Sequence, residues 1–186
     1  MAVTNNFSFL VNRINDSLFE FTVNVEGKNI SSFTYNGEER VTRWSNITVI
    51  DFFVDHLKDI ILEDPYPFGS EDTIGSCFPN EKDILVDFDK LDDDAELAKA
   101  EEYMSKVEDW RRKHNWNFYV VGAFYPNVTF RRHAEKIEVS WNNNNLYDEF
   151  GVDYLNKEGC ALIDLDIFEK AVRELIIEYK TLNHDA

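Results

Sequence analysis

Alternating apolar and polar side chains over residues 19–25 constrain this chain more than any other feature. The odd positions carry Phe19, Phe21, Val23 and Val25, with polar residues between them. A period of two places all four apolar side chains on one face of a half-buried β-strand. Turn chemistry follows at Gly27, after Glu26, and again at Gly37, after Asn36. Residues 7–44 are therefore predicted to form an antiparallel meander.

Three later segments have apolar residues at helical spacing. In the first, which ends before Pro65, the apolar positions are Ile50, Phe53, Val54, Leu57, Ile60 and Ile61. The second starts near Asp92 and ends at His114 in a run of basic residues, which the carbonyl end of a helix favours. The third starts at Asp164 or Asp166 and carries a buried stripe as far as Tyr179. These patterns predict three helices.

A second hairpin is predicted between the second and third helices. Strand patterns over residues 128–132 and 136–141 are separated by three residues, a connection short enough for a hairpin. Its apolar face includes Trp141, which we expect to be a core residue. Arg131 and Glu138 are placed so that they can pair across the two strands.

Length and composition fit one domain. The chain has 186 residues, of which 44% are hydrophobic, enough for one core and short for two. Residues 83–88 and 160–163 add two short strand predictions. We predict a single α+β domain over residues 1–186, with an antiparallel sheet and about three helices.

Charge is strongly acidic and unevenly distributed. The chain has 36 Asp and Glu against 19 Lys and Arg, a formal net charge of -17 at pH 7. Residues 51–109 hold 19 of the acids and 5 of the bases, whereas residues 110–141 hold 2 acids and 6 bases. This balance argues against nucleic acid or an anionic membrane as a direct partner. It predicts a basic partner or none, because acidity is also common among soluble proteins. The leading interpretation is a protein partner that has a basic surface, complementary to the acidic charge.

The acidic block supplies the predicted partner-binding face. Three of its residues follow one another at intervals of four along the first helix, and the rest lie in the segment leading into the second helix. They are Asp51, Asp55, Asp59, Asp87, Asp89, Asp92, Asp93 and Asp94. Carboxylates one helical turn apart are about 6 Å apart, close to the phosphate spacing of about 7 Å along one DNA strand. A nucleic-acid mimic is a narrower version of this prediction.

Motifs that carry catalysis are missing from the sequence. It has no G-x-S-x-G, G-x-x-x-x-G-K-[ST], G-x-G-x-x-G or H-E-x-x-H motif. The four histidines are not spaced as metal ligands, and an EF-hand loop counted from Asp87 lacks its glycine and its final glutamate. Cys77 and Cys160 are far apart in the sequence, so neither a disulfide framework nor a thiolate zinc site is indicated. We therefore predict a non-enzymatic protein with no cofactor and no metal, soluble and cytoplasmic, since the sequence also lacks a basic leader and a long apolar stretch.

The basic segment leaves an alternative open. Its residues could form the pocket of a small enzyme or anionic-ligand binder, because arginine holds phosphate or carboxylate and histidine can transfer protons. The residues in question are Arg111, His114, Arg131, Arg132, His133 and Trp141. The competing interpretation is structural: these cations neutralise the protein's own acidic block.

A resemblance also rests on this segment. W-R-R-K-H at residues 110–114, P-N-V-T-F-R-R at 126–132 and I-E-V-S-W at 137–141 resemble a segment of uncharacterised bacterial proteins. Some of these are immunity-type or defence-associated, and some join the segment to an ImmA/IrrE-like metallopeptidase domain. The peptidase activity does not carry over, because its H-E-x-x-H helix is absent here. The resemblance implies a bacterial or phage conflict setting and nominates no catalytic residues. In that setting, the acidic charge predicts an immunity protein or anti-defence inhibitor that binds and inhibits its partner.

Overall fold

The first third of the chain forms most of a large antiparallel sheet in the computed structural model, which describes residues 6–15, 18–44, 48–62, 94–119 and 123–184. The strand order is β1-β2-β5-β4-β8, and a short β3 also pairs with β2. The strands are β1 (Phe7–Asn15), β2 (Leu18–Val25), β3 (Lys28–Asn29), β4 (Ser32–Tyr35), β5 (Glu38–Trp44) and β8 (Val152–Tyr154).

This strand order corrects the predicted meander, in which each strand would pair with the next. Instead, β5 lies between β2 and β4, so that Phe21 pairs with Thr42. A polar turn redirects the chain: the side-chain oxygen of Asn29 accepts hydrogen bonds from the backbone N–H of Ser31 at 3.0 Å and from its hydroxyl at 2.8 Å. The β4–β5 hairpin that follows can then return along β2.

Both predicted glycine turns are present. Glu26 and Gly27 have φ values of 50° and 80°, and Asn36 and Gly37 have 53° and 79°. Two consecutive residues with positive φ are typical of the type I′ turn, whose twist matches that of the strands it joins. Glycine at the second position adopts this conformation without the steric cost of a Cβ atom.

A second antiparallel sheet has the order β6-β7-β9. Its strands are β6 (Val128–His133), β7 (Lys136–Asn142) and β9 (Glu158–Asp164). The predicted hairpin is confirmed in its register, with Arg131 opposite Glu138. The strand predicted at residues 160–163 lies within β9, whereas the one at 83–88 lies outside the described residues.

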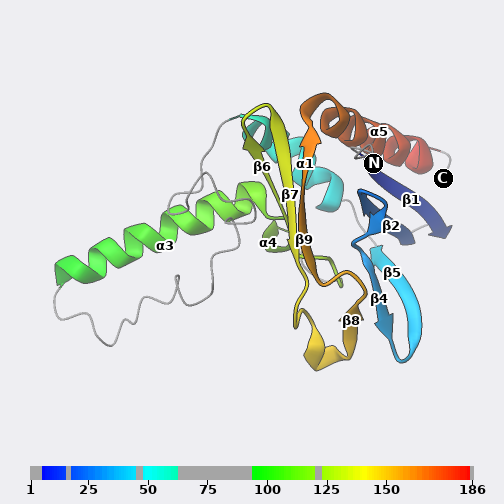
Figure 1. Ribbon diagram of the computed structural model, residues 1–186, viewed down its shortest axis with the longest axis horizontal. Helices are drawn as coiled ribbons and strands as arrows, with labels where there is room; N and C mark the ends of the chain where they lie inside the picture. The colour runs from blue at the N-terminus through cyan, green and yellow to red at the C-terminus, as the bar shows by residue number, and fades with distance from the viewer. Residues whose placement is uncertain (1–5, 16–17, 45–47, 63–93, 120–122, 185–186) are drawn as a thin grey trace, which may run out of the picture.

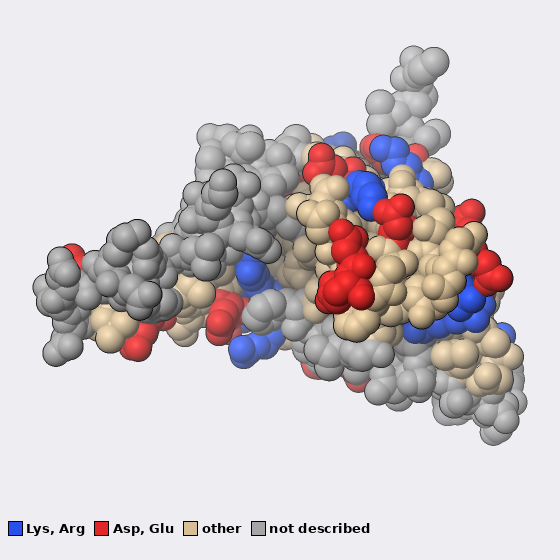
Figure 2. All heavy atoms as spheres, turned by 90° about the horizontal axis from the view of Figure 1, so that it is seen from below, with Lys and Arg blue, Asp and Glu red and all other residues tan. Residues whose placement is uncertain are grey.

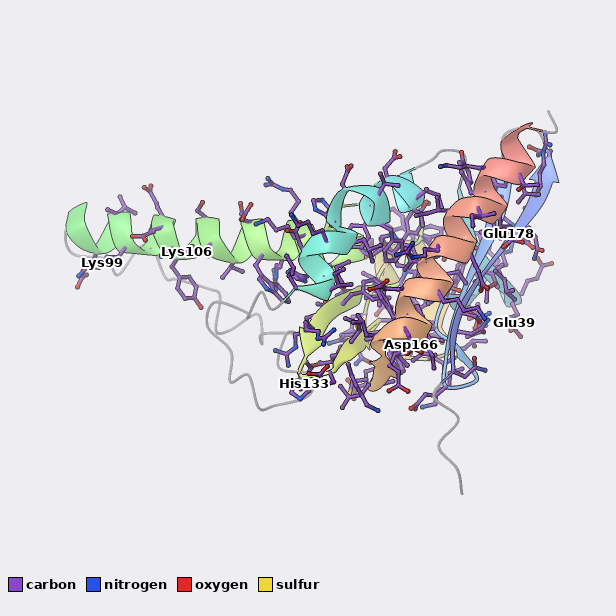
Figure 3. The ribbon with its side chains drawn as sticks, turned by 90° about the horizontal axis from the view of Figure 1, so that it is seen from above. Glu39, Lys99, Lys106, His133, Asp166 and Glu178 are labelled. Atoms are coloured by element: carbon purple, nitrogen blue, oxygen red, sulfur yellow. The ribbon has the colours of Figure 1, made fainter. Side chains whose placement is uncertain are left out.

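Helices complete an α+β fold, as predicted. They are α1 (Thr48–Ile61), α3 (Asp94–His114), α4 (Trp116–Tyr119) and α5 (Leu165–His184). Figure 1 shows α1 and α5 at one end of the two sheets, while α3 extends away from them. Lys99 and Lys106 mark the projecting part of α3 in the view from above (Figure 3). None of the helices within the described ranges is long and apolar enough to cross a membrane.

Aromatic side chains from both sheets and from α1, α4 and α5 meet in one core. The ring of Trp116, on α4, lies 4.7 Å from Phe21 of the large sheet and 6.0 Å from Phe130 of the small sheet. Phe53 of α1 lies 5.6 Å from the same indole, and Phe168 of α5 packs on Phe130 at 5.6 Å. These rings join the sheets and the helices into a continuous apolar cluster.

Trp141 belongs to this core, as predicted. Its side chain is only 3% exposed. On the neighbouring strand, a Cβ atom built at Gly159 would lie 2.3 Å from the indole, far inside van der Waals contact. The indole therefore occupies the space that a side chain at position 159 would need.

Candidate functional site

One stripe of α1 faces solvent, and it combines carboxylates with apolar side chains. Its exposed members, spaced by three or four residues, are Asp51, Val54, Asp55, Lys58 and, just beyond the helix, Leu62. We call these five residues the α1 stripe. Val54 and Leu62 are 61% and 51% exposed. The expectation that Val54 belongs to the buried face is wrong, because Phe52 takes the place beside Phe53 in the core.

Asp51 and Asp55 are close enough to influence each other. The pKa of the Asp51 carboxyl is raised above its ordinary value, first by burial and then by the negative charge of Asp55. Like charges one helical turn apart disfavour the ionised form in this way. The two carboxyl groups are therefore neighbours on one face of α1.

Asp59 lies to the side of this stripe. Its carboxylate is 3.5 Å from Nδ1 of His56, which is partly buried. Eight residues of an α-helix rotate a side chain by about 80° relative to the first, so Asp51 and Asp59 do not share one line. Of the three acids predicted to share one face of α1, Asp51 and Asp55 do so and are exposed. Asp59 instead lies beside His56.

Acidic residues of α3 adjoin those of α1 at this histidine. The two helices pack against each other. The pKa of Asp109 on α3 is lowered, first by its hydrogen bond with Lys113, and His56 adds a smaller electrostatic contribution. His56 thus lies within electrostatic reach of carboxylates from both helices.

Of the other five acidic residues of the predicted face, the structure describes one. Asp87, Asp89, Asp92 and Asp93 lie outside the described residues, and Asp94 is the first residue of α3. Acidic side chains also occur elsewhere: the view from below (Figure 2) shows a group of them on another face, with basic side chains interspersed. The α1 stripe is more than a group of acidic side chains, because it also exposes the apolar side chains of Val54 and Leu62.

The basic segment is arranged around a buried ion pair. The Arg131 side chain is 4% exposed, and its Nε and Nη2 atoms lie 2.8 Å and 2.7 Å from one oxygen of Glu138, which is fully buried. The other Glu138 oxygen accepts a hydrogen bond from the Ser140 hydroxyl. The guanidinium thus pairs with a carboxylate of the same hairpin, as predicted for Arg131 and Glu138. Because Glu138 lies within residues 110–141, this pair does not neutralise the acidic block at residues 51–109.

The other members of the predicted ligand pocket are dispersed. His114 is buried, stacks on Trp110 at 4.3 Å and has Nδ1 2.8 Å from the carbonyl oxygen of Phe130. Trp141 lies in the core, on the face of the small sheet opposite to Arg131. This geometry favours a structural role for His114, Arg131 and Trp141.

Three predicted pocket residues lie nearer the surface. Arg132 donates to the carbonyl oxygen of Ala134 and lies 3.2 Å from the Glu135 carboxylate. His133 is at the outer end of the β6–β7 hairpin (Figure 3). Arg111, half-buried, is in the last turn of α3. The structure therefore does not gather the six residues of this prediction around one point.

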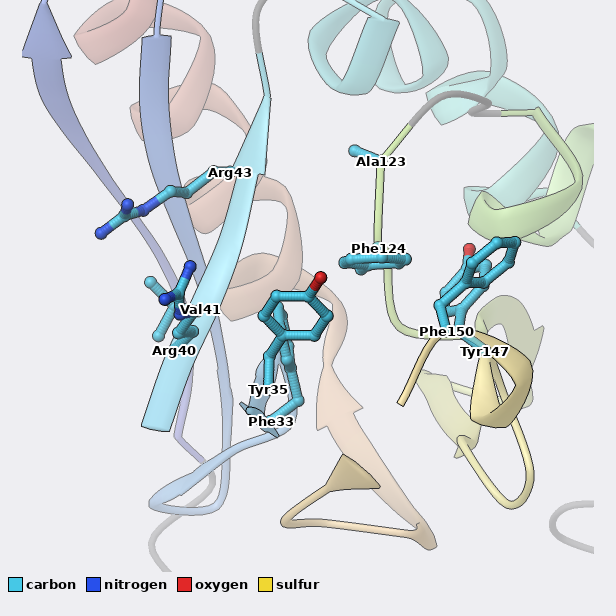
Figure 4. Close-up of a pocket in the computed structure, with 9 residues that line it drawn as sticks. All are labelled: Phe33, Tyr35, Arg40, Val41, Arg43, Ala123, Phe124, Tyr147 and Phe150. Carbon is cyan, nitrogen blue, oxygen red and sulfur yellow. The ribbon is translucent and has the colours of Figure 1, made fainter. Parts of the chain in front are cut away.

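A cavity that the sequence did not predict lies elsewhere, between the β4–β5 hairpin and the segments around Phe124 and Tyr147 (Figure 4). Its volume is about 580 Å³ and its lining is mostly aromatic. No local pattern could have revealed it, because residues more than 100 positions apart form its walls.

Metal ligands do not cluster in the part of the chain that the structure describes: no group of three or more His, Cys, Asp or Glu side chains there could hold an ion. Comparison with known proteins adds no relative, since no family model, no curated protein and no solved structure matches the chain.

Proposed function

We propose that the protein is a non-enzymatic interaction protein that binds and inhibits a protein partner with a basic surface. The observation that carries this proposal is the α1 stripe, where two carboxylates and two large exposed apolar side chains share one face of a helix. Protein interfaces combine apolar contacts with charges at their rim. The stripe has both components.

Electrostatics supports the same proposal. A net charge of -17 produces a field that attracts basic partners from a distance and repels acidic ones. Asp51 and Asp55 concentrate part of that charge beside Val54. The long-range field would accelerate encounter, while the apolar side chains would provide contact once the partner is in place.

We take the biological class from the resemblance of residues 110–141 to a segment of uncharacterised bacterial proteins, some of which are immunity-type or defence-associated. On that basis the inhibitor is an immunity protein or an anti-defence protein, and its partner is an effector with a basic functional site. In the narrower version, the Asp51–Asp55 pair imitates neighbouring phosphates of nucleic acid.

Affinity capture tests this proposal. The tagged full-length chain is used to capture proteins from the source cell at about 50 mM and about 200 mM salt, a range over which charge-driven contacts weaken markedly. We expect a basic partner in stoichiometric amount, with less recovered at the higher salt. Recovery of no such protein at either salt would contradict the proposal.

A matched pair of variants separates the α1 stripe from acidity in general. Val54→Asp places a charge in the apolar part of the stripe, and Ile177→Asp makes the same change at a side chain of α5 that is 64% exposed. Both variants are more acidic than the parent chain. We expect only Val54→Asp to lose the partner, and retention of the partner by Val54→Asp would exclude the stripe as its binding site.

A further inference from the structure

A cavity lies beside the β4–β5 hairpin, and none of its described lining residues belongs to the α1 stripe. Five aromatic rings from three separate parts of the chain surround it: Phe33, Tyr35, Phe124, Tyr147 and Phe150. In the close-up (Figure 4), Phe33 and Tyr35 of β4 lie on one side of Phe124, and Tyr147 and Phe150 lie on the other. A volume of about 580 Å³ is within the range of small-molecule sites.

The rings form one connected aromatic wall. Phe124 is at its centre, with its centroid 5.9 Å from Phe33, 6.1 Å from Tyr35 and 5.2 Å from Tyr147. Phe150, 6.0 Å from Phe124, is 58% exposed. Such a wall presents ring faces and edges against which a flat aromatic group can pack.

Two arginines line this cavity, and each pairs with a glutamate just outside the described lining. The charged side chains among its described lining residues are Arg40 and Arg43, and neither Asp nor Glu lines it. Arg43 uses Nε and Nη2 to hold one oxygen of Glu20 on β2, at 3.0 Å and 2.7 Å. Arg40 has its guanidinium 5.4 Å from the centroid of the Tyr35 ring, so the cation lies beside the aromatic wall.

Arg40 can exchange its present partner for a ligand. Its Nη2 atom lies 2.8 Å from a Glu38 oxygen, but the two side chains are 39% and 72% exposed. Exposed ion pairs contribute little to stability. A guanidinium has five N–H donors, and a ligand carboxylate could therefore bind Arg40 beside Glu38 or in its place.

The walls are held in position before any ligand binds. Tyr147 has φ of 62°, a left-handed conformation that is unusual for an aromatic residue. Its hydroxyl accepts a hydrogen bond from Asn117 at 2.8 Å. The backbone oxygen of Phe124 accepts one from Thr42 of β5, also at 2.8 Å. The first contact holds the Tyr147 ring against α4, and the second holds the backbone of Phe124 against the large sheet.

We propose that this cavity binds a small aromatic carboxylic acid, with the ring against the aromatic wall and the carboxylate on Arg40. The wall selects a planar apolar group, and Arg40 selects a negative charge at its edge. This site is independent of the partner-binding proposal, because it shares no residue with the α1 stripe.

Isothermal titration of the full chain with two matched probes tests this assignment. Naphthalene-2-acetate carries the ring and the charge, whereas naphthalene-2-acetamide carries the ring alone. We expect the acid to bind at least about tenfold more tightly than the amide, because only the acid can form a charge-assisted hydrogen bond with Arg40. Equal binding of acid and amide, or no binding of the acid at up to about 10 mM, a limit equivalent to less than 3 kcal/mol, would overturn the proposal.

Three variants assign the interactions. Arg40→Gln should abolish the preference for the acid and leave amide binding unchanged. Phe150→Ala, at an exposed ring, should weaken both probes equally. Arg173→Gln is the control, because this arginine pairs with Glu169 on α5 and its side chain is 70% exposed; it should change neither. A preference for the acid that persists in Arg40→Gln would also overturn the proposal.

Discussion

At the scale of single residues, the contribution of an aromatic side chain to the stability of the fold depends on whether that side chain is buried. Trp141 and Phe150 are both large and apolar, yet the first is 3% and the second 58% exposed. Burying a side chain of this size provides several kcal/mol through removal of apolar surface from water and close packing. Only the buried ring is therefore expected to stabilise the fold.

Trp141→Ala should lower the free energy of unfolding by about 3–5 kcal/mol, because it leaves a cavity in the core. Phe150→Ala is the control and should change that free energy by less than about 0.5 kcal/mol, as is usual for surface positions. Urea denaturation of the two variants and the parent measures both values. Similar losses in the two variants would show that the indole has no special role in the core.

Cys160 should be a slowly reacting thiol. The residue as a whole is exposed, but partial burial of its thiol raises its pKa above the ordinary value, and the negative charges of Glu138 and Glu26 raise it further. Because the thiolate is the reactive form, a raised pKa means that alkylation accelerates only at higher pH. In a Cys77→Ser chain, the pH midpoint of iodoacetamide modification should be higher for the folded protein than for the same chain in urea. A folded midpoint at or below the unfolded one would refute this expectation.

At the scale of elements, the small sheet contains a polar pair where a sheet interior is usually apolar. Arg131 and Glu138 occupy directly opposed positions of β6 and β7, and both are buried. Burial removes both charges from water, so each charge is tolerated in the sheet only while the other is present.

Replacing one member of this pair should cost more than replacing both. Glu138→Leu leaves the buried Arg131 without this carboxylate and is expected to lower the free energy of unfolding by about 3–5 kcal/mol. The double variant Arg131→Met/Glu138→Leu should lose less than either single variant. Denaturant unfolding of the four chains gives the coupling energy, and additive losses would contradict a direct interaction.

Periodicity predicted the elements better than their arrangement. The alternation in β2 and β7 and the helical spacing in α1 and α5 each reflect one buried face, which is a local property. The insertion of β5 between β2 and β4 depends on a turn at Asn29. The spacing of apolar residues along the strands carries no information about which strands pair. The short strand β8 was also missed, because three residues are too few to establish a period.

At the scale of the whole molecule, charge and shape must be considered together. The i, i+4 spacing of acids along α1 predicted Asp51 and Asp55 correctly as neighbours. It could not predict that Val54 lies exposed between them, because the apolar pattern of α1 was compatible with burial on a wider face. The aromatic cavity likewise depends on the packing of distant segments. Sequence thus reveals charge and periodicity, whereas exposure and cavities require the tertiary structure.

The salt dependence of partner binding tests the central proposal most directly. The dissociation constant of the complex with the captured partner is measured from about 50 mM to about 200 mM salt. The chains compared are the parent, Asp51→Asn/Asp55→Asn, and the control Glu174→Gln/Glu178→Gln, which removes two acids at the same spacing from exposed positions of α5. We predict weaker binding and a shallower salt dependence for the α1 variant alone. Equal affinity and equal slopes for all three chains would contradict the proposal that the partner binds the α1 stripe.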